Sequence, residues 1–376
     1  MNKKIILVML PALSVVLSSC GQVIDYKTNL DKYVKEMNYH ENFNVLQLTD
    51  IHWNANTSAI ASKQYLDKLF KEVDRKIKAE QGNDAKIDLV ELTGDQFMLA
   101  NTFHVDTFIN YFEKKAEEYG FLYASIWGNH DRHGLYNANW LSDRFAKAAH
   151  SIYIEPNDNL YGRSNFVINL VKDGSTKWQI ANLDSGASFS ESAVSPFRDY
   201  DYIRKDQTDW WLKEHAKVGE NVPTIAYYHI PQDDNLKAWD AIHNDHAAYK
   251  HKFFKLEGFA DNGNEQYASD FIKEGRTHNL KAAFMGHAHN VDWTVDYEGV
   301  VLGLGVKTGS ELYFAHIDAN SEDEFMKEGL TSVGINENFD LIGASLVTIK
   351  DENNFDLEHL YLNERKTNDF VSWVKW

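Results

Sequence analysis

Short apolar runs alternate with amphipathic stretches along the chain from Phe43 onward. The first run, residues 44–49, predicts a strand, and the apolar positions of residues 65–80 recur at helical spacing. The same alternation predicts strands over residues 87–92 and 121–127 and a helix over residues 108–119. This order of elements is typical of an α/β layer architecture.

The middle and the end of the chain are richer in predicted strands. Residues 166–171 and 178–183 are strand-like and are joined through Asp173-Gly174, which is a strong hairpin signal. A helix is expected over residues 208–216, and the acidic stretch of residues 321–324 predicts a solvated loop. Further strands are predicted over residues 223–228, 280–285, 293–296, 300–303, 345–350 and 356–362.

Five of the predicted strands end in polar residues of types that can bind metals. These residues are Asp50 and His52, Asp95, Asn129 and His130, His229, and His287 and His289. Because ligands bind beyond the carboxyl ends of strands in α/β sheets, we expect these side chains to converge. Carboxylate, imidazole and amide donors suit Mn, Fe, Zn or Co. Glycines at positions 94, 128 and 286 suit backbone that turns sharply or approaches closely.

A single Asp-x-His pair is a weak signal, and the series as a whole is a strong one. The series Asp50-x-His52, Gly94-Asp95, Gly128-Asn129-His130-Asp131, His229 and Gly286-His287-x-His289 resembles the motif set of the calcineurin-like metallophosphoesterase family. The resemblance spans residues 44–290, and the later strands are similar to the family's closing strands. It implies a four-layer αββα sandwich of two mixed β-sheets flanked by helices.

The resemblance also implies a centre of two divalent or trivalent metal ions. Its ligands would be Asp50, His52 and His289 for one ion, Asn129, His229 and His287 for the other, and Asp95 as the bridge. Such a centre hydrolyses a phosphate monoester or diester with a metal-bridging hydroxide. By the same resemblance, His130 lies beside the leaving group, and Asp131 orients His130 or its loop.

Arg132 and His133, which follow the Gly128–Asp131 motif, and Met98, which departs from the family pattern, bear on the predicted substrate contacts and family branch. Arg132 and His133 are candidates for contact with the substrate, although a salt bridge is an equal alternative for Arg132. Many family members carry an aspartate or a tyrosine three residues after the bridging aspartate, where this chain has Met98. The chain therefore resembles the branch related to purple acid phosphatases that lacks the metal-binding tyrosine.

The longest segments between motif-bearing strands are residues 184–206 and 232–258. Their aromatic residues are expected either to shape the substrate cleft or to pack the loops down. These aromatic residues are Phe189, Phe197, Tyr200, Tyr202 and Trp239.

The N-terminus predicts a secretory signal peptide over residues 1–19, because Lys3 and Lys4 precede an apolar run that ends in small residues. Residues 17–20 (LSSC) resemble the lipobox of bacterial lipoproteins, and Cys20 is the only cysteine of the chain. We expect a lipidated Cys20 that anchors the protein to the extracellular face of the bacterial cell membrane. The alternative is a plain secreted protein. The predicted domains are a tether at 20–41, a phosphoesterase domain at 42–366 and a tail at 367–376.

The formal net charge is −18, and it becomes −20 without residues 1–19. A strongly acidic surface repels nucleic acid, so we expect a small phosphate ester as the substrate and no nucleic-acid partner. The competing hypothesis is a non-catalytic surface lipoprotein that uses the fold for binding. That hypothesis predicts lost ligands, and all seven positions keep donor side chains.

Overall fold

The structure is a computed structural model of the 376-residue chain. It describes residues 34–53, 58–132, 138–154, 160–187, 200–245, 248–255, 269–310, 314–322, 324–363, 370 and 373–376. The predictions for residues 1–19, Cys20, His133, Phe189 and Phe197 lie outside these ranges. Within the described ranges, no helix has both the length and the apolar character that are needed to cross a membrane.

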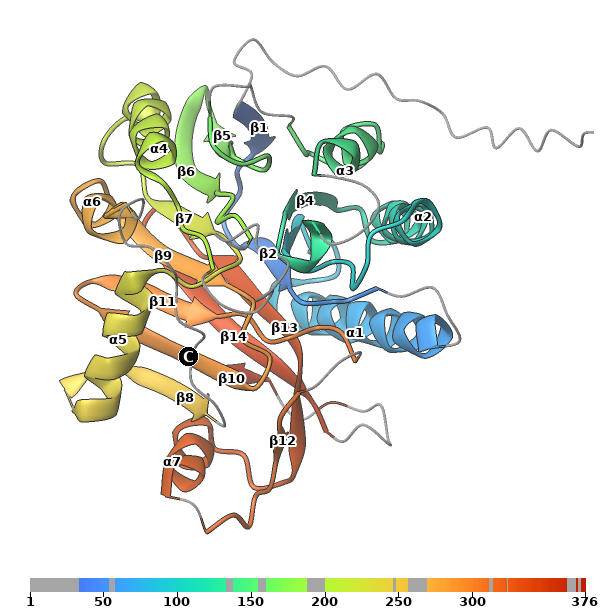
Figure 1. Ribbon diagram of the computed structural model, residues 1–376, viewed down its shortest axis with the longest axis vertical. Coiled ribbons are helices and arrows are strands. Elements are labelled where there is room, and N and C mark those ends of the chain that lie inside the picture. Colours follow the sequence, from blue (N-terminus) through green and yellow to red (C-terminus); the bar gives the residue numbers. More distant parts are fainter. Residues whose placement is uncertain are drawn as a thin grey trace, which may run out of the picture.

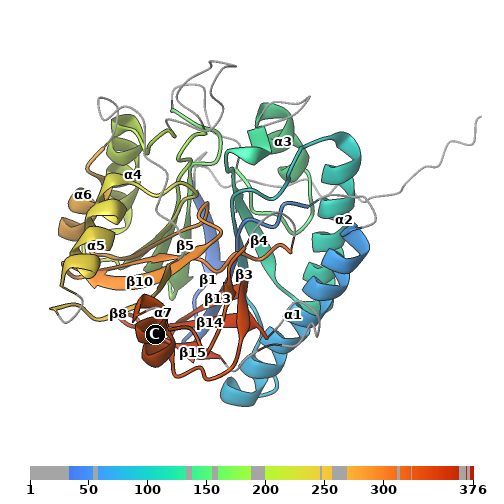
Figure 2. The ribbon, with the colours of Figure 1, turned by 60° about the horizontal axis from the view of Figure 1, so that its bottom comes forward.

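Two mixed β-sheets pack face to face in the centre of the molecule (Figures 1 and 2). The first sheet has the order β1-β5-β6-β7-β9-β11-β10-β8. Its strands are β1 (Val34–Asn38), β5 (Phe166–Lys172), β6 (Ser175–Asn182), β7 (Thr224–Tyr227), β8 (His251–Lys255), β9 (Leu280–Met285), β10 (Val291–Tyr297) and β11 (Val300–Leu304). The second sheet has the order β15-β14-β13-β2-β3-β4, and β12 pairs with β13. Its strands are β2 (Phe43–Leu48), β3 (Leu89–Thr93), β4 (Leu122–Ile126), β12 (His316–Ile317), β13 (Phe339–Ile349), β14 (Phe355–Leu362) and β15 (Val374–Lys375).

Helices cover the outer faces of both sheets (Figure 2). On the side of the second sheet lie α1 (Ser58–Gln81), α2 (Thr102–Tyr119) and α3 (Ala138–Phe145). On the side of the first sheet lie α4 (Lys205–Val218), α5 (Asp233–Asn244) and α6 (Phe271–Thr277), and α7 (Glu324–Val333) packs near β8. This arrangement confirms the α/β fold of two mixed sheets flanked by helices.

The helical spacing of residues 65–80 produces one buried face on α1. The side chains on this face are Leu66, Leu69, Phe70, Val73 and Ile77. Phe70 stacks on Phe121 at the start of the neighbouring strand, with ring centroids 5.5 Å apart. Every residue of the strands β2 and β3 below these helices is buried, because both faces of the sheet are covered.

The parallel strands carry the functional turns. In the second sheet β2, β3 and β4 run parallel to one another, and in the first sheet β6, β7, β9 and β11 do the same. Parallel neighbours end at the same edge of a sheet, so the turns after these strands lie side by side. The antiparallel hairpin of β5 and β6 was predicted, and its turn residues Asp173 and Gly174 both have positive φ.

The folded domain is wider than residues 42–366, which corrects the predicted boundaries. Residues Val34–Asn38, inside the predicted tether, form β1 and pair in parallel with β5. Residues Val374–Lys375, inside the predicted tail, form β15 and pair with β14. Both segments are short and lack a periodic apolar pattern, and it is pairing with the edge of an existing sheet that makes them strands.

Helix α7 begins at Glu324, at the end of the acidic stretch that was predicted to be a loop. It buries Met326 and Leu330 in a small second hydrophobic cluster together with Phe339. The acidic residues before the helix concealed this amphipathic stretch in the sequence. Helices α3, α5 and α6 were likewise not predicted.

A buried carboxyl group lies between the two sheets. Glu91 on β3 is the register partner of Gln47 on β2, and Asn182 of the opposite sheet donates from Nδ2 to Glu91 Oε1 at 3.4 Å. Burial raises the pKa of Glu91 to about 8, although the hydrogen bond from Asn182 opposes the shift. The nearby Tyr227 is also fully buried, and its pKa is raised by burial and by the charge of Glu91. The Glu91 carboxyl therefore keeps its proton at neutral pH.

Glu91 is expected to make the folded protein less stable as pH rises. The unfolded chain loses this proton near pH 4.5 and the folded protein loses it near pH 8, so the free energy of unfolding should fall between these values. The contribution is up to about 1.4 kcal/mol per pH unit. The side chain of Glu91→Gln is neutral at every pH, so this variant should lose the fall of the free energy of unfolding with pH. Urea unfolding at a series of pH values, with a chelator present, measures this free energy. The exposed Glu36→Gln is the control, and parallel profiles of wild type and Glu91→Gln would refute the expectation.

Candidate metal centre

Four buried side chains form a first group of possible metal ligands. Asp50 and His52 follow β2, Asp95 follows β3, and His289 follows β9. One donor atom from each lies within 4.8 Å of the others. The Nε2 atoms of His52 and His289 are 3.0 Å apart, and His289 Nε2 is 3.1 Å from Asp50 Oδ1.

A second group lies beside the first and shares Asp95 with it. Donor atoms of Asp95, His229 and His287 lie within 4.8 Å of one another. His229 Nε2 is 3.4 Å from Asp95 Oδ2. The amide oxygen of Asn129 is 3.2 Å from His229 Nε2 and 3.0 Å from His287 Nδ1. The structure therefore brings all seven predicted ligands together, from strands of both sheets.

The orientation of His229 fits a metal ligand. Its Nδ1 lies 2.9 Å from the carbonyl oxygen of Thr93. A carbonyl only accepts hydrogen bonds, so Nδ1 carries a proton and donates it to Thr93. When the ring is neutral, its unprotonated Nε2 faces Asp95 and Asn129, as in histidines that bind metals. The donors present suit a divalent cation, because they combine carboxylate, imidazole and amide groups and include no thiolate.

Strained backbone occurs at four of these residues. Asp50, His52, Asp95 and His287 have φ values of 52°, 50°, 51° and 77°. The left-handed region costs non-glycine residues roughly 1–2 kcal/mol each, and such strain concentrates at functional sites. Hydrogen bonds between adjacent turns maintain it, because Asp50 N donates to Gly94 O at 3.0 Å and His52 N donates to Asp95 O at 2.9 Å.

Two of the predicted close approaches of glycine backbone occur at Asp95 and His229 of the second group. A Cβ atom on Gly128 would lie 2.2 Å from Asp95 Oδ1 and 2.8 Å from His229 Nε2. A Cβ atom on Gly94 would lie 2.3 Å from His229 Nδ1. No other residue type fits at these positions without moving the ligands.

The family description "Calcineurin-like phosphoesterase" matches residues 43–291. This chain belongs to the calcineurin-like phosphoesterase family. The matched segment contains every residue of both donor groups.

The chain is also similar to the "Probable inactive purple acid phosphatase 28" of Arabidopsis thaliana. The two chains are 26% identical over 249 residues, which are 60% of this chain and 59% of that protein. The chain thus spans less than two thirds of the relative's length. The similarity agrees with the predicted resemblance to the branch related to purple acid phosphatases.

Burial and neighbouring charges shift the pKa values of the candidate metal ligands in both directions. Burial raises the pKa of Asp50, but a hydrogen bond from His289 and nearby imidazoles outweigh it and hold this pKa below its ordinary value. Burial lowers the pKa of His229, but Asp95 and Asp50 raise it to about 9. Burial and the charge of His229 lower the pKa of His287 to about 3. The centre therefore combines ionised carboxylates with imidazoles of very different basicity.

His130 lies directly against the shared carboxylate. It begins the short 3₁₀ helix η1 (His130–Arg132), and its backbone N–H donates to Asp95 Oδ1 at 2.7 Å. Its ring meets the His52 ring edge to face, with centroids 5.0 Å apart. The ring thus lies at the border of the first donor group.

Asp131 is buried and anchors the turn that carries His130. Its Oδ1 accepts the N–H of Phe97 at 2.9 Å, and its Oδ2 accepts the N–H of Gly128 at 2.8 Å. Arg132 forms an ion pair with Asp184, which is the alternative considered for it. A direct contact of Arg132 with the substrate remains a prediction.

Residues after β11 support the turn of Asp50, and sequence reasoning missed them. The ammonium of Lys307 donates to the carbonyl of Asp50 at 2.8 Å, and Thr308 Oγ1 accepts the N–H of Thr49 at 3.1 Å. Their position shortly after the apolar run Val300–Leu304 is the signal that the sequence offers for them, although lysine and threonine are poor metal ligands.

The described aromatic residues of the long segments divide into two kinds. Tyr200 packs edge to face on His287, with ring centroids 4.3 Å apart, so it borders the second donor group. Tyr202 is fully buried, and Trp239 is almost fully buried. Tyr202 therefore packs its loop against the core, and Trp239 packs helix α5 against it.

Replacing Gly128 by alanine is expected to weaken metal binding, because the new Cβ would displace Asp95. We expect Gly128→Ala to reduce the affinity for Mn²⁺ at least about tenfold in titration calorimetry of chelator-treated protein. The control is Gly174→Ala, where a Cβ meets nothing within 4 Å but φ is 73°. The control should lower the free energy of unfolding by about 1 kcal/mol and leave Mn²⁺ affinity unchanged. Equal affinity in the two variants would contradict the expectation.

Proposed function

We propose that this chain hydrolyses a phosphate ester, a monoester or a diester, at a centre of two metal ions. The observation that carries the proposal is that the Asp95 carboxylate belongs to both donor groups. A carboxylate shared between two sets of three further ligands suits a pair of cations. The candidate ions are Mn, Fe, Zn or Co, which accept these donors.

Each proposed ion has three ligands besides Asp95. Asp50, His52 and His289 would hold one ion, and Asn129, His229 and His287 would hold the other. When bound, such ions lower the pKa of water and offset the negative charge of the phosphoryl group. The nucleophile is then water and not a side chain.

The proposed role of His130 is to protonate the leaving group. The water oxygen forms the new bond to phosphorus and releases a proton to solvent. The bond from phosphorus to the ester oxygen breaks, and both electrons remain on that oxygen. The His130 imidazolium donates the proton that neutralises it. The position of His130 beside Asp95 and His52 supports this role.

Asp131 contributes by holding His130 in place. Its carboxylate ties the backbone of Gly128 to that of Phe97, the second residue after the shared Asp95. A turn fixed at both of these points limits the directions in which the His130 ring can move. Such preorganisation is worth several kcal/mol when the reacting atoms must stay within hydrogen-bonding reach.

A non-catalytic binding protein is the second candidate. The observation that favours it is the name of the plant relative, which describes that protein as probable inactive. The complete donor sets and His130 in this chain favour catalysis, because a protein that only binds a partner does not need all of them.

The function is tested by hydrolysis of p-nitrophenyl phosphate and bis-p-nitrophenyl phosphate. We expect the full chain, purified in mild detergent, to require Mn²⁺ or another divalent ion for turnover. Asp95→Asn should lower kcat at least about a hundredfold and His130→Asn by about a hundredfold. The preferred ester identifies the substrate class. The absence of turnover with metal demonstrably bound would favour the binding protein.

We also propose that Cys20 is lipidated and anchors the phosphoesterase outside the cell. The apolar run after Lys3 and Lys4 and the small residues before Cys20 support this proposal. Two acyl chains on one cysteine give stable attachment to a membrane.

Mass spectrometry of the mature protein tests the anchor. We expect an N-terminal residue Cys20 that carries a diacylglycerol group and partitions into detergent. Cys20→Ser should leave the protein unprocessed or release it. An unmodified N-terminus at another residue would refute lipidation.

A further inference from the structure

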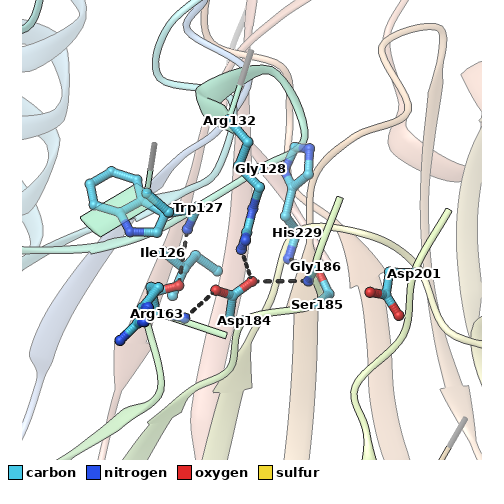
Figure 3. Close-up of polar contacts among 12 residues, drawn as sticks. Ile126, Trp127, Gly128, Arg132, Arg163, Asp184, Ser185, Gly186, Asp201 and His229 are labelled. Atoms are coloured by element: carbon cyan, nitrogen blue, oxygen red, sulfur yellow. Dashed lines mark hydrogen bonds and ion pairs between the residues drawn. The ribbon is translucent and has the colours of Figure 1, made fainter. Parts of the chain in front are cut away.

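An ion pair next to the metal centre has no part in the proposed chemistry. Arg132 donates from Nη2 to Asp184 Oδ1 (Figure 3), and the two residues follow β4 and β6, which belong to different sheets. The Asp184 side chain is fully buried, and that of Arg132 is 22% exposed. Removing two charges from water costs free energy, so we expect an ion pair in this place to have a function.

Asp184 is a rigid anchor because polar groups surround it. Its Oδ1 also accepts the N–H of Gly186 at 2.9 Å, and its Oδ2 accepts the N–H of Arg163 at 2.6 Å. Its own N–H donates to Asn165 Oδ1 at 2.9 Å. Gly162 approaches so closely that a Cβ there would lie 2.5 Å from Asp184 Cβ. These contacts fix the carboxylate independently of Arg132.

The same turn also holds a metal ligand. Ser185 follows Asp184, and its Oγ accepts the N–H of His229 at 3.3 Å and the N–H of Ile230 at 2.8 Å. Figure 3 shows Ser185 and His229 close to the Arg132–Asp184 pair. The turn after β6 therefore supports both a ligand and the helix η1 that contains Arg132.

The short helix η1 is fastened at both of its ends. At its start, the His130 N–H is bound to the shared carboxylate of Asp95. At its end, Arg132 is bound to Asp184 by its side chain and to the carbonyl of Asn129 by its N–H at 3.3 Å. Only one residue separates His130 from Arg132, so a loss of the ion pair would release the turn next to the His130 ring.

We propose that the Arg132–Asp184 ion pair positions His130 for proton transfer to the leaving oxygen. This inference rests on the proposed phosphoester hydrolysis. Arg132 acts as a positioning residue and not as a phosphate ligand, because a fully buried carboxylate already neutralises its charge and its Nε is buried as well. Proton transfer requires hydrogen-bonding distance, and small displacements of the donor slow it strongly.

The leaving group provides a specific readout. A well-placed proton donor lets the ester oxygen leave as a neutral alcohol, so the rate depends little on the pKa of that alcohol. A displaced donor forces the oxygen to leave with a negative charge, and the rate then falls steeply as the pKa of the alcohol rises. A loss of stability or of metal would lower all rates by the same factor.

The experiment uses the full chain with Mn²⁺ and aryl esters of the preferred type, from dinitrophenyl to phenyl. Arg132→Gln and Asp184→Asn should each lower kcat at least about tenfold for the phenyl ester and less than about threefold for the dinitrophenyl ester. The double variant should be no slower than either single variant, because both remove one interaction. In a protein that already carries His130→Asn, neither substitution should further change how the rate depends on the pKa of the leaving alcohol.

Two matched variants and one spectrum complete the test. Arg75→Gln removes an exposed ion pair with Glu72, whose atoms are 2.7 Å apart, and should change nothing. Arg132→Lys keeps the positive charge and replaces Arg132→Gln in the test if the latter fails to fold. Its kcat for the phenyl ester should lie between those of wild type and Arg132→Gln. In long-range ¹H–¹⁵N spectra of chelator-treated protein, the His130 ring signals, identified by their loss in His130→Asn, should shift in both pair variants and stay in place in Arg75→Gln.

The outcomes separate this inference from the proposed function. If wild type is active but the variants lose activity equally for all esters with a raised KM, Arg132 contacts the phosphoryl group and the positioning role is refuted. Unchanged rates and unchanged His130 signals also refute it. If wild type hydrolyses none of the esters while Mn²⁺ is bound, the proposed function fails and the inference fails with it.

Discussion

The carboxylate of Asp95 lies where the turns after strands of both sheets meet. Its Oδ2 faces His229 at 3.4 Å and His52 at 3.9 Å, and its Oδ1 accepts the N–H of His130. Burial raises the pKa of Asp95, but His229 and the other imidazoles outweigh burial and hold it well below its ordinary value. A buried carboxylate of this kind needs positive charge around it. The histidines of the surrounding turns can supply this charge, and so can a cation bound by these turns.

The requirement to surround one carboxylate explains the geometry of the backbone. Side chains from five turns must come together in a small volume, so the turns approach one another more closely than ordinary side chains allow. Gly94 and Gly128 provide this space, and Asp50, His52 and His287 accept left-handed backbone to reach the centre. Strain at these positions persists because hydrogen bonds between the turns fix the backbone.

Contacts from neighbouring residues orient the candidate metal ligands and the turn that carries His130. Thr93 orients the ring of His229, Lys307 holds the carbonyl of Asp50, and Ser185 holds the backbone of His229. The Arg132–Asp184 pair is one of these contacts, and it is the one that lies nearest in sequence to His130. Catalysis by preorganised groups depends on such support, because a donor displaced by an ångström loses much of its effect.

Much of this protein was determined by local sequence. The apolar period of residues 65–80 predicted the buried face of α1, and the donors at the ends of apolar runs predicted all seven residues that the structure brings together. These signals are readable because periodicity and strand ends are properties of neighbouring residues. Only the tertiary structure decided that β1 and β15 complete the sheets, that Lys307 supports Asp50, and that Arg132 pairs with Asp184, 52 residues away. Such contacts depend on which strand ends lie side by side, and a pairing of distant residues leaves no periodic pattern in the chain.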